Sequence, residues 1–565
     1  MQSSGFANGP ERRTDWDTVD WRKAQRLVRG LRQRIFRAAQ AGEQKKVRSL
    51  QKLMLRSYSN ILMSVRRVTQ VNAGKNTPGI DKLVVKTPQA RGRLVDDLAA
   101  FQPWKSKPVR RVYIPKSNGK QRPLGIPTVM DRCFQAMVKN ALEPEWEAKF
   151  EGTSYGFRPG RGCHDAMTKI YFLACPHRRK KWILDADIKG AFDNISHDFL
   201  LNALGQVPGR ELIKQWLKAG VMEDGVFHET PLGTPQGGVI SPLLLNVALH
   251  GMEAALGVRY NAKGHTLGER AIVRYADDFV VCCETREDAL RVKDVLLPPW
   301  LAERGLSLSE EKTRIVHLTE GFDFLGFNVR HYAAPLTSRT GYKLLIRPSK
   351  KSVSGLRKKM RDAWLRLKGH SVSAVLWKLN PIIRGWANYY RTGVAKATFS
   401  KLDGWMHRRA MRYARSTHPT KPAYWLRRRY WGKLNKERDD QWVFGNKRSG
   451  HHLLKFNWFK IERHVLVKGR ASPDDASLRE YWWKRRKVNI RHLSMSDVLL
   501  AENQDWVCPI CMMDLLNGEP LERHHKTART DGGSESYSNR VLLHLYCHQQ
   551  KTAEWRKNRR CSADA

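Results

Sequence analysis

The chain has 565 residues, 41% of them hydrophobic, and carries 102 Lys and Arg against 54 Asp and Glu, a net charge of +48. This length predicts several domains, and this charge indicates a polyanionic partner, nucleic acid before a membrane surface. The chain has no run of about 18 apolar residues, no apolar secretory segment at its N-terminus and only nine cysteines, so we expect no membrane partner and a reducing compartment.

The predicted elements indicate an α+β chain of several domains. Residues 20–70 have apolar positions at helical spacing, and residues 72–82 form a loop rich in Gly, Pro and Asn. Residues 107–330 mix short β-rich and helical segments. Residues 351–440 hold 23 Lys and Arg against 5 acidic residues, with 12 aromatics. We therefore place five domains, at residues 1–100, 101–335, 336–434, 435–500 and 501–565.

Two segments of the α+β region suit phosphate binding. "VRRVYIPKSNGKQRPLGIP" (109–127) predicts two strands joined by a turn, on which Lys116 and Arg122 can reach a triphosphate. "TPLGTPQGGVISPLLLNVALHGME" (230–253) predicts a loop followed by a long apolar helix. Gly237 and Gly238 in that loop allow a ligand to approach the backbone closely.

Three carboxylates stand where strands are expected to end. "AIVRYADDFVVCC" (271–283) predicts a hairpin with Asp277 and Asp278 at its turn, and the strand "WILDAD" ends at Asp187. If these side chains meet across one sheet, their repulsion requires cations. Oxygen ligands suit Mg²⁺, and two such ions suit phosphoryl transfer. Taken alone, the Asp-Asp pair is more often a solvated turn, because Asp favours turns.

In order and spacing, these segments resemble the fingers and palm of a group II intron-encoded reverse transcriptase, from about residue 50 to residue 430. The resemblance implies RNA-directed DNA polymerase activity, with Asp187, Asp277 and Asp278 as the catalytic Mg²⁺ ligands. It also implies a set of contacts to the incoming dNTP: Lys116 and Arg122 at the triphosphate, Phe192 excluding a ribose 2′-hydroxyl, Gln236 and Gly237 lining the pocket, and Lys312 near the departing pyrophosphate. Outside this resemblance, Phe192 fits core packing equally well and Lys312 fits a solvated surface.

The basic region after residue 351 predicts a helical bundle. We expect amphipathic helices at 355–369, at 379–392 after a proline turn, and at 402–431. A single Arg there fits a solvated face, and the aromatics fit core packing better than base stacking. The net charge of the whole region nevertheless indicates a grip on a phosphate backbone. Its position resembles the family's thumb, or maturase domain, which implies binding of the intron RNA and help in its splicing.

The C-terminal region predicts a zinc site. Cys508 with Cys511, and His544 with Cys547, form two pairs, each with two residues between its members. Four such ligands form a closed structural Zn²⁺ site, and the bound metal stabilises a segment too short for a large core.

The residues between and after these pairs resemble the HNH nuclease motif, a β-hairpin and a helix around one divalent metal, Mg²⁺ or similar. The resemblance implies His524 and His548 as metal ligands, His525 as the base that activates water, and Asn539 as the residue that fixes the loop. A zinc knuckle that binds DNA without cutting is the alternative. His544 and His548 remain partly exchangeable between the zinc site and the nuclease metal.

These resemblances together imply a multifunctional protein that acts by retrohoming. It would bind its intron RNA, assist splicing, and nick target double-stranded DNA, which it contacts through residues 435–500. The new 3′ end would prime reverse transcription. We expect it in a bacterial cytoplasm or nucleoid, or in an organellar matrix. The alternatives are a reverse transcriptase of a different system, which should lack the basic bundle and the nuclease, and a splicing factor with little polymerase activity.

Overall fold

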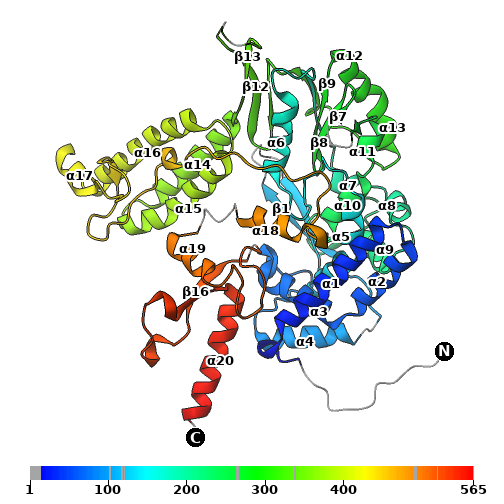
Figure 1. The fold of residues 1–565 in the computed structure, drawn as a ribbon, viewed down its shortest axis with the longest axis horizontal. Helices are drawn as coiled ribbons and strands as arrows, with labels where there is room; N and C mark the ends of the chain where they lie inside the picture. The colour runs from blue at the N-terminus through cyan, green and yellow to red at the C-terminus, as the bar shows by residue number, and fades with distance from the viewer. Residues whose placement is uncertain are drawn as a thin grey trace.

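The computed structural model describes residues 14–100, 103–115, 119, 121–261, 266–335, 337, 339–487, 493–517 and 519–563. Figure 1 shows the N-terminal helices at the lower right, the central strands above them, a helical bundle at the left and the C-terminal helix at the bottom. Among the described residues, no helix is both long and apolar enough to cross a membrane.

An N-terminal layer of helices supports the central sheets. It comprises α1 (Trp21–Gln40), α2 (Gln44–Arg56), α3 (Tyr58–Arg66), α4 (Pro88–Ala99) and α5 (Val129–Lys149). Asp20 caps α1 by accepting a hydrogen bond from Lys23 N, and the helix buries one apolar stripe that includes Val28, Leu31 and Ile35. The helical spacing expected for residues 20–70 is therefore confirmed.

The sheet at the centre of the molecule has the order β10-β3-β9-β8 and is antiparallel throughout. Its strands are β3 (Trp182–Asp187), β8 (Ala271–Tyr275), β9 (Asp278–Cys283) and β10 (Arg314–His317). Residues Phe279–Cys283 are buried along the whole of β9, because helices cover both faces of the sheet. The predicted hairpin and the strand that ends at Asp187 are both confirmed.

Two further sheets flank this one. The first has the order β2-β1-β4-β5, from β1 (Val109–Pro115), β2 (Gln121–Ile126), β4 (Val221–Glu223) and β5 (Val226–His228). The second has the order β11-β12-β13, from β11 (Phe322–Phe324), β12 (Phe327–Ala333) and β13 (Tyr342–Pro348). A small ribbon pairs β6 (Arg259–Tyr260) with β7 (Thr266–Leu267).

Helices between the strands complete the α+β region. They are α6 (Cys163–Ala174), α7 (Ala191–Asn194), α8 (His197–Leu204), α9 (Arg210–Lys218), α10 (Ser241–Ala248), α11 (Met252–Ala255), α12 (Arg286–Arg291) and α13 (Leu297–Ala302). The long apolar helix expected within 230–253 is wrong, because the segment divides into α10 and α11. Gly251, with φ of +94°, supplies the left-handed turn between them.

The basic region forms a bundle of α14 (Lys350–Arg366), α15 (Val372–Tyr390), α16 (Lys396–Thr417) and α17 (Ala423–Tyr430) (Figure 1). Several aromatics, including Trp364, Phe399 and Tyr413, pack inward as expected, while Trp377 and Tyr424 are exposed. The turn expected before residue 381 is wrong, because α15 continues through Pro381. Pro381 is exposed while Ile383 is buried, so packing of the apolar face outweighs one missing backbone hydrogen bond.

The C-terminal part returns to the N-terminal helices. After the ribbon β14 (Trp431–Gly432) and β15 (Val443–Phe444) come α18 (Arg479–Lys487), α19 (Met495–Glu502), β16 (Leu521–His525), β17 (Arg540–His544) and α20 (Leu545–Ala563). Cys508, Cys511 and Cys547 share one hydrophobic core with Trp16 and Trp21. A buried ion pair of 2.8 Å between Arg66 and Glu519 and a hydrogen bond of 2.6 Å from Gln550 Nε2 to Asp17 O join the same surfaces.

Candidate active sites and metal centres

The central sheet brings the three predicted aspartates together. Asp187 ends β3 and lies opposite Asp278, the first residue of the neighbouring β9. Asp277 occupies the turn between β8 and β9, directly after Ala276, whose φ of +59° makes that turn tight. The antiparallel strand β3 ends where β9 begins, at the same end of the sheet, so the side chains of Asp187 and Asp278 converge there.

The electrostatics of this cluster fit a divalent cation. Burial, a hydrogen bond with Asp187 and the charge of Asp277 raise the pKa of Asp278 to about 8. Burial also raises the pKa of Asp277. Carboxylates that resist simultaneous ionisation supply the oxygen ligands that Mg²⁺ prefers. The ammonium of Lys312 is paired with Asp187, and this hydrogen bond raises the pKa of Lys312.

A cavity of about 280 Å³ opens beside the aspartates. Its lining combines acidic, basic and small residues from five segments of the chain: Arg122, Pro123, Asp187, Ile188, Gly190, Ala191, Asp193, Gln236, Asp277, Asp278 and Lys312. Gly237 adjoins it with φ of +128°, and a Cβ there would lie 2.7 Å from Gly125 O. The cavity brings together six of the residues that the sequence singled out, namely Arg122, Asp187, Gln236, Asp277, Asp278 and Lys312, while Lys116 lies outside the described residues.

Phe192 and Asp193 are neighbours in the short helix that follows β3. Phe192, in α7, packs partly into the core, and its ring centroid lies 6.3 Å from that of Phe157. Asp193, for which the sequence predicts no role, lines the cavity and accepts a hydrogen bond of 3.3 Å from Gln236 Nε2. Its place in the short helix directly after the strand that ends at Asp187 is the signal that would have identified it. Asp185, also without a predicted role, pairs with Arg314 at 3.2 Å.

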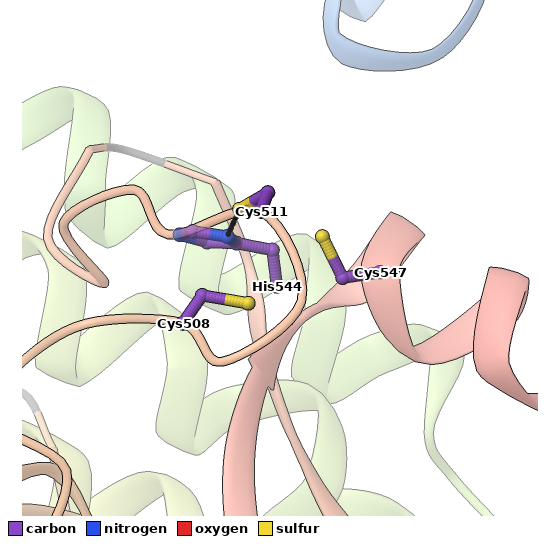
Figure 2. A group of neighbouring side chains, drawn as sticks. All are labelled: Cys508, Cys511, His544 and Cys547. Carbon is purple, nitrogen blue, oxygen red and sulfur yellow. Dashed lines mark hydrogen bonds between the residues drawn. The ribbon is translucent and has the colours of Figure 1, made fainter. Parts of the chain in front are cut away.

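The four predicted zinc ligands form one buried cluster. The ligand atoms of Cys508, Cys511, His544 and Cys547 all lie within 4.8 Å of one another. Figure 2 shows them converging from the loop after α19, the end of β17 and the first turn of α20. Hydrogen bonds from Cys511 and Cys547 lower the pKa of the Cys508 thiol and favour the thiolate form that binds metal. Three thiols and one imidazole at this spacing fit Zn²⁺.

A groove of about 510 Å³ lies on the hairpin β16–β17 and α20, and His524, His525 and His548 line it. The rings of His524 and His548 lie 5.2 Å apart. His544 belongs to the cysteine cluster, so the structure separates the two histidines that the sequence left exchangeable. Burial and the nearby charge of His548 lower the pKa of His524, which favours the neutral ligating form. His548 Nδ1 contacts Glu522 Oε2 at 2.6 Å, a carboxylate partner that orients the imidazole.

The two other nuclease residues are held by local contacts. His525 Nε2 lies 3.3 Å from Glu535 Oε1, and this contact is not a hydrogen bond. Asn539 accepts a hydrogen bond from Thr527 N at 2.9 Å and donates to Thr527 O and Ser534 O at 3.1 and 2.8 Å. Asn539 therefore ties together the two ends of the loop between the strands.

The two regions predicted to contact nucleic acid, the bundle α14–α17 and residues 435–500, differ in how far their side chains are exposed. The bundle α14–α17 exposes two large aromatic side chains, Trp377 (79%) and Tyr424 (73%). Residues 464–485, in contrast, fold back on α6. Asp165 accepts hydrogen bonds there from His464 Nε2, Val467 N and an Arg485 guanidinium nitrogen at 3.0, 2.9 and 2.6 Å.

Four family models match the chain, in the order of its regions. Residues 16–98 match the N-terminal domain of reverse transcriptase, and residues 114–329 match reverse transcriptase (RNA-dependent DNA polymerase). Residues 353–431 match the group II intron maturase-specific domain, and residues 508–554 match HNH endonuclease.

Several proteins are similar to this chain. Protein YkfC of Escherichia coli is 35% identical over 303 residues, which cover 47% of this chain and 79% of YkfC. The group II intron-encoded protein LtrA of Lactococcus lactis is 32% identical over 299 residues, 42% of this chain and 49% of LtrA. A 91 kDa protein in the cob intron of Schizosaccharomyces pombe is 29% identical over 401 residues, 56% of this chain and 48% of that protein. The chain thus spans about half the length of the last two relatives.

Proposed function

The chain belongs to the group II intron-encoded proteins that combine reverse transcriptase, maturase and HNH endonuclease domains, and on that premise we propose how its residues perform each activity. The observation that carries the proposal is the convergence of Asp187, Asp277 and Asp278 at one cavity with Arg122 and Lys312.

The cavity serves as the polymerase centre. Asp187, Asp277 and Asp278 hold Mg²⁺, which when bound stabilises the attacking and leaving oxygens of phosphoryl transfer. Arg122 contacts the triphosphate of the incoming dNTP, and the exposed Lys312 ammonium neutralises charge that develops on the departing pyrophosphate. Lys116 joins Arg122 in this role.

Other residues of the polymerase centre contact the sugar and base of the incoming nucleotide. Gln236 and Gly237 line the pocket, and the close approach of Gly237 to Gly125 supports a role in which backbone contacts the nucleotide. Phe192 excludes the ribose 2′-hydroxyl. Asp193 holds Gln236 in place through their hydrogen bond.

Primer extension on an RNA template tests this centre. Asp277→Ala should lower the extension rate by about three orders of magnitude, because several kcal/mol of metal-derived stabilisation is lost. Splicing of the intron RNA should persist. Asp294→Ala, which removes an exposed carboxylate that does not line the cavity, is the control. Equal rates for wild type and Asp277→Ala would refute the assignment, and so would the failure of wild type to extend with its own intron RNA present.

The groove of the C-terminal domain serves as the endonuclease centre. His524 and His548 hold a divalent metal, which when bound stabilises charge on the cleaved phosphate. His525 takes a proton from the attacking water, and its ring lines the groove beside His524 and His548. Asn539 keeps the loop that carries Glu535 against the strands.

A strand-nicking assay on target DNA tests the general base. His525→Ala should slow nicking by about 10²–10⁴-fold, the usual contribution of such a base, while insertion of the RNA into the other strand continues. His177→Ala changes an exposed histidine outside both the groove and residues 435–500 and serves as the control. Undiminished nicking by His525→Ala would overturn the assignment.

The remaining regions of the chain bind the nucleic acids and stabilise the nuclease domain. The thumb, residues 336–434, grips the intron RNA, and residues 435–500 contact double-stranded target DNA. The fingers and palm occupy residues 101–335 after the N-terminal region 1–100, and the nuclease occupies residues 501–565 with Zn²⁺ on its Cys3His cluster. The family matches fall within these boundaries and so support them. We place the protein with its RNA in a bacterial cytoplasm or nucleoid, or in an organellar matrix.

A further inference from the structure

A loop with no assigned role in nucleotide binding lies against the catalytic turn. Residues 153–158 connect to β8, the outer strand of the central sheet, through two backbone hydrogen bonds. Arg274 N donates to Thr153 O at 3.0 Å, and Tyr155 N donates to Arg274 O at 2.9 Å. A Cβ on Gly156 would lie 2.3 Å from Ala276 N. The loop is therefore packed as closely on the turn as backbone allows.

Two buried polar side chains, Asn246 and Arg274, link the loop of residues 153–158 to the catalytic turn. Asn246 Nδ2 donates to Gly156 O at 2.9 Å. The buried Arg274 guanidinium donates to Asn246 Oδ1 at 3.1 Å and to Ala276 O at 3.3 Å. The same two side chains thus fix both the loop and the backbone that carries Asp277, so neither can shift alone.

Phe157 is held in a conformation that its side chain disfavours. Its φ is +59°, a region that bulky residues rarely adopt, and its side chain is 49% exposed. The next residue, Arg158, is anchored in the interior by Glu147 and enforces this backbone. A strained and exposed aromatic beside an active site is evidence of a functional constraint, because core packing does not explain it.

The ring of Phe157 meets the ring of Phe192. Their centroids are 6.3 Å apart and their planes make an angle of 72°, which is the edge-to-face arrangement that aromatic pairs favour. Phe192 stands in a helix of four residues and is only partly buried, so the core restrains one part of its ring. Phe157 supplies a restraint from the loop side.

We propose that Phe157 is a positioning residue for sugar selection, which holds the Phe192 ring where it meets the 2′ position of the incoming nucleotide. This inference rests on the proposed role of Phe192. The loop transmits the position of the catalytic turn to Phe192, since Asn246 and Arg274 couple the two. Sugar selection and metal binding are thereby set by one connected element.

The test is incorporation of dNTP and rNTP by the full-length protein on an RNA template. Phe157→Ala should lower the ratio of kcat/KM for dNTP to that for rNTP about two- to tenfold, the range expected for loss of one aromatic pair. Phe157→Tyr keeps the ring and should retain the wild-type ratio. In a Phe192→Val background, Phe157→Ala should cause no further loss, because the residues act through one contact.

The controls separate this inference from the proposed function. Phe172→Ala removes an equally exposed phenylalanine from α6 and should leave the ratio unchanged. If Phe192→Val relaxes selection and Phe157→Ala does not, the inference is wrong and the role of Phe192 stands. If Phe192→Val leaves selection unchanged, both are wrong. Equal loss of dNTP and rNTP incorporation in Phe157→Ala would assign Phe157 to the template or to folding, and would also overturn the inference.

Discussion

The ion pair between Arg158 and Glu147 anchors the loop of residues 153–158, and its removal provides a quantitative test of the structure. Arg158 and Glu147 side chains are 0% and 1% exposed. Two guanidinium nitrogens of Arg158 donate to the two carboxylate oxygens at 2.9 Å, and a third donates to Glu151 O and Ser154 O at 2.6 and 2.9 Å. Arg158→Ala removes all four hydrogen bonds and leaves the Glu147 charge buried without its partner. We expect a loss of about 3–5 kcal/mol, the usual cost of breaking a buried pair.

Amide hydrogen exchange of β8 measures this loss, because the loop is bonded to that strand. At 1.36 kcal/mol for each factor of ten, exchange in β8 should accelerate by about 10²–10³·⁵. Replacing the pair by apolar residues, as Glu147→Leu with Arg158→Met, should recover most of the protection. Lys46→Ala, whose partner Glu43 is exposed, should change nothing measurable. Acceleration in Arg158→Ala of less than about fivefold would refute the energetic reasoning.

Three further perturbations address the metal centres and the nuclease loop. Cys511→Ser should lower the bound zinc, measured by elemental analysis, and should expose the N-terminal helices as well as the nuclease to protease, since Cys511 and Trp21 share a core. Cleavage confined to the nuclease would contradict that shared core. Asn539→Ala should destabilise the nuclease loop by about 1–3 kcal/mol, seen as faster exchange at Thr527, and unchanged exchange would exclude its structural role. Lys312→Met should slow single-turnover incorporation about 10²-fold with little change in KM for dNTP, and an effect on KM alone would place Lys312 on the substrate rather than on the leaving group.

Local patterns were sufficient for the parts of the molecule whose chemistry lies within one short segment. The apolar runs on either side of Asp277 and Asp278 predicted a hairpin, and the structure has one at that place. The paired spacing of Cys508 with Cys511 predicted the metal cluster, because residues three apart in a turn present both sulfurs to one ion.

Local patterns failed where a helix was held by packing. A proline predicts a break, yet α15 passes through Pro381 because its buried face outweighs the lost backbone bond. The apolar run after Gly238 predicted one helix, but a left-handed glycine divides it in two. In both cases the local preference is a small energy, and tertiary contacts decide the outcome.

The sequence by itself determined the chemistry: which carboxylates, thiols and imidazoles are present, and at what spacing. Only the tertiary structure decided which of them meet. It assigned His544 to the cysteines and set His548 beside His524, it brought Asp193 to the cavity, and it placed Phe157 against Phe192. These contacts join segments whose separation along the chain carries no periodic signal. They arise from the packing of whole elements, and a pattern read within one element does not contain them.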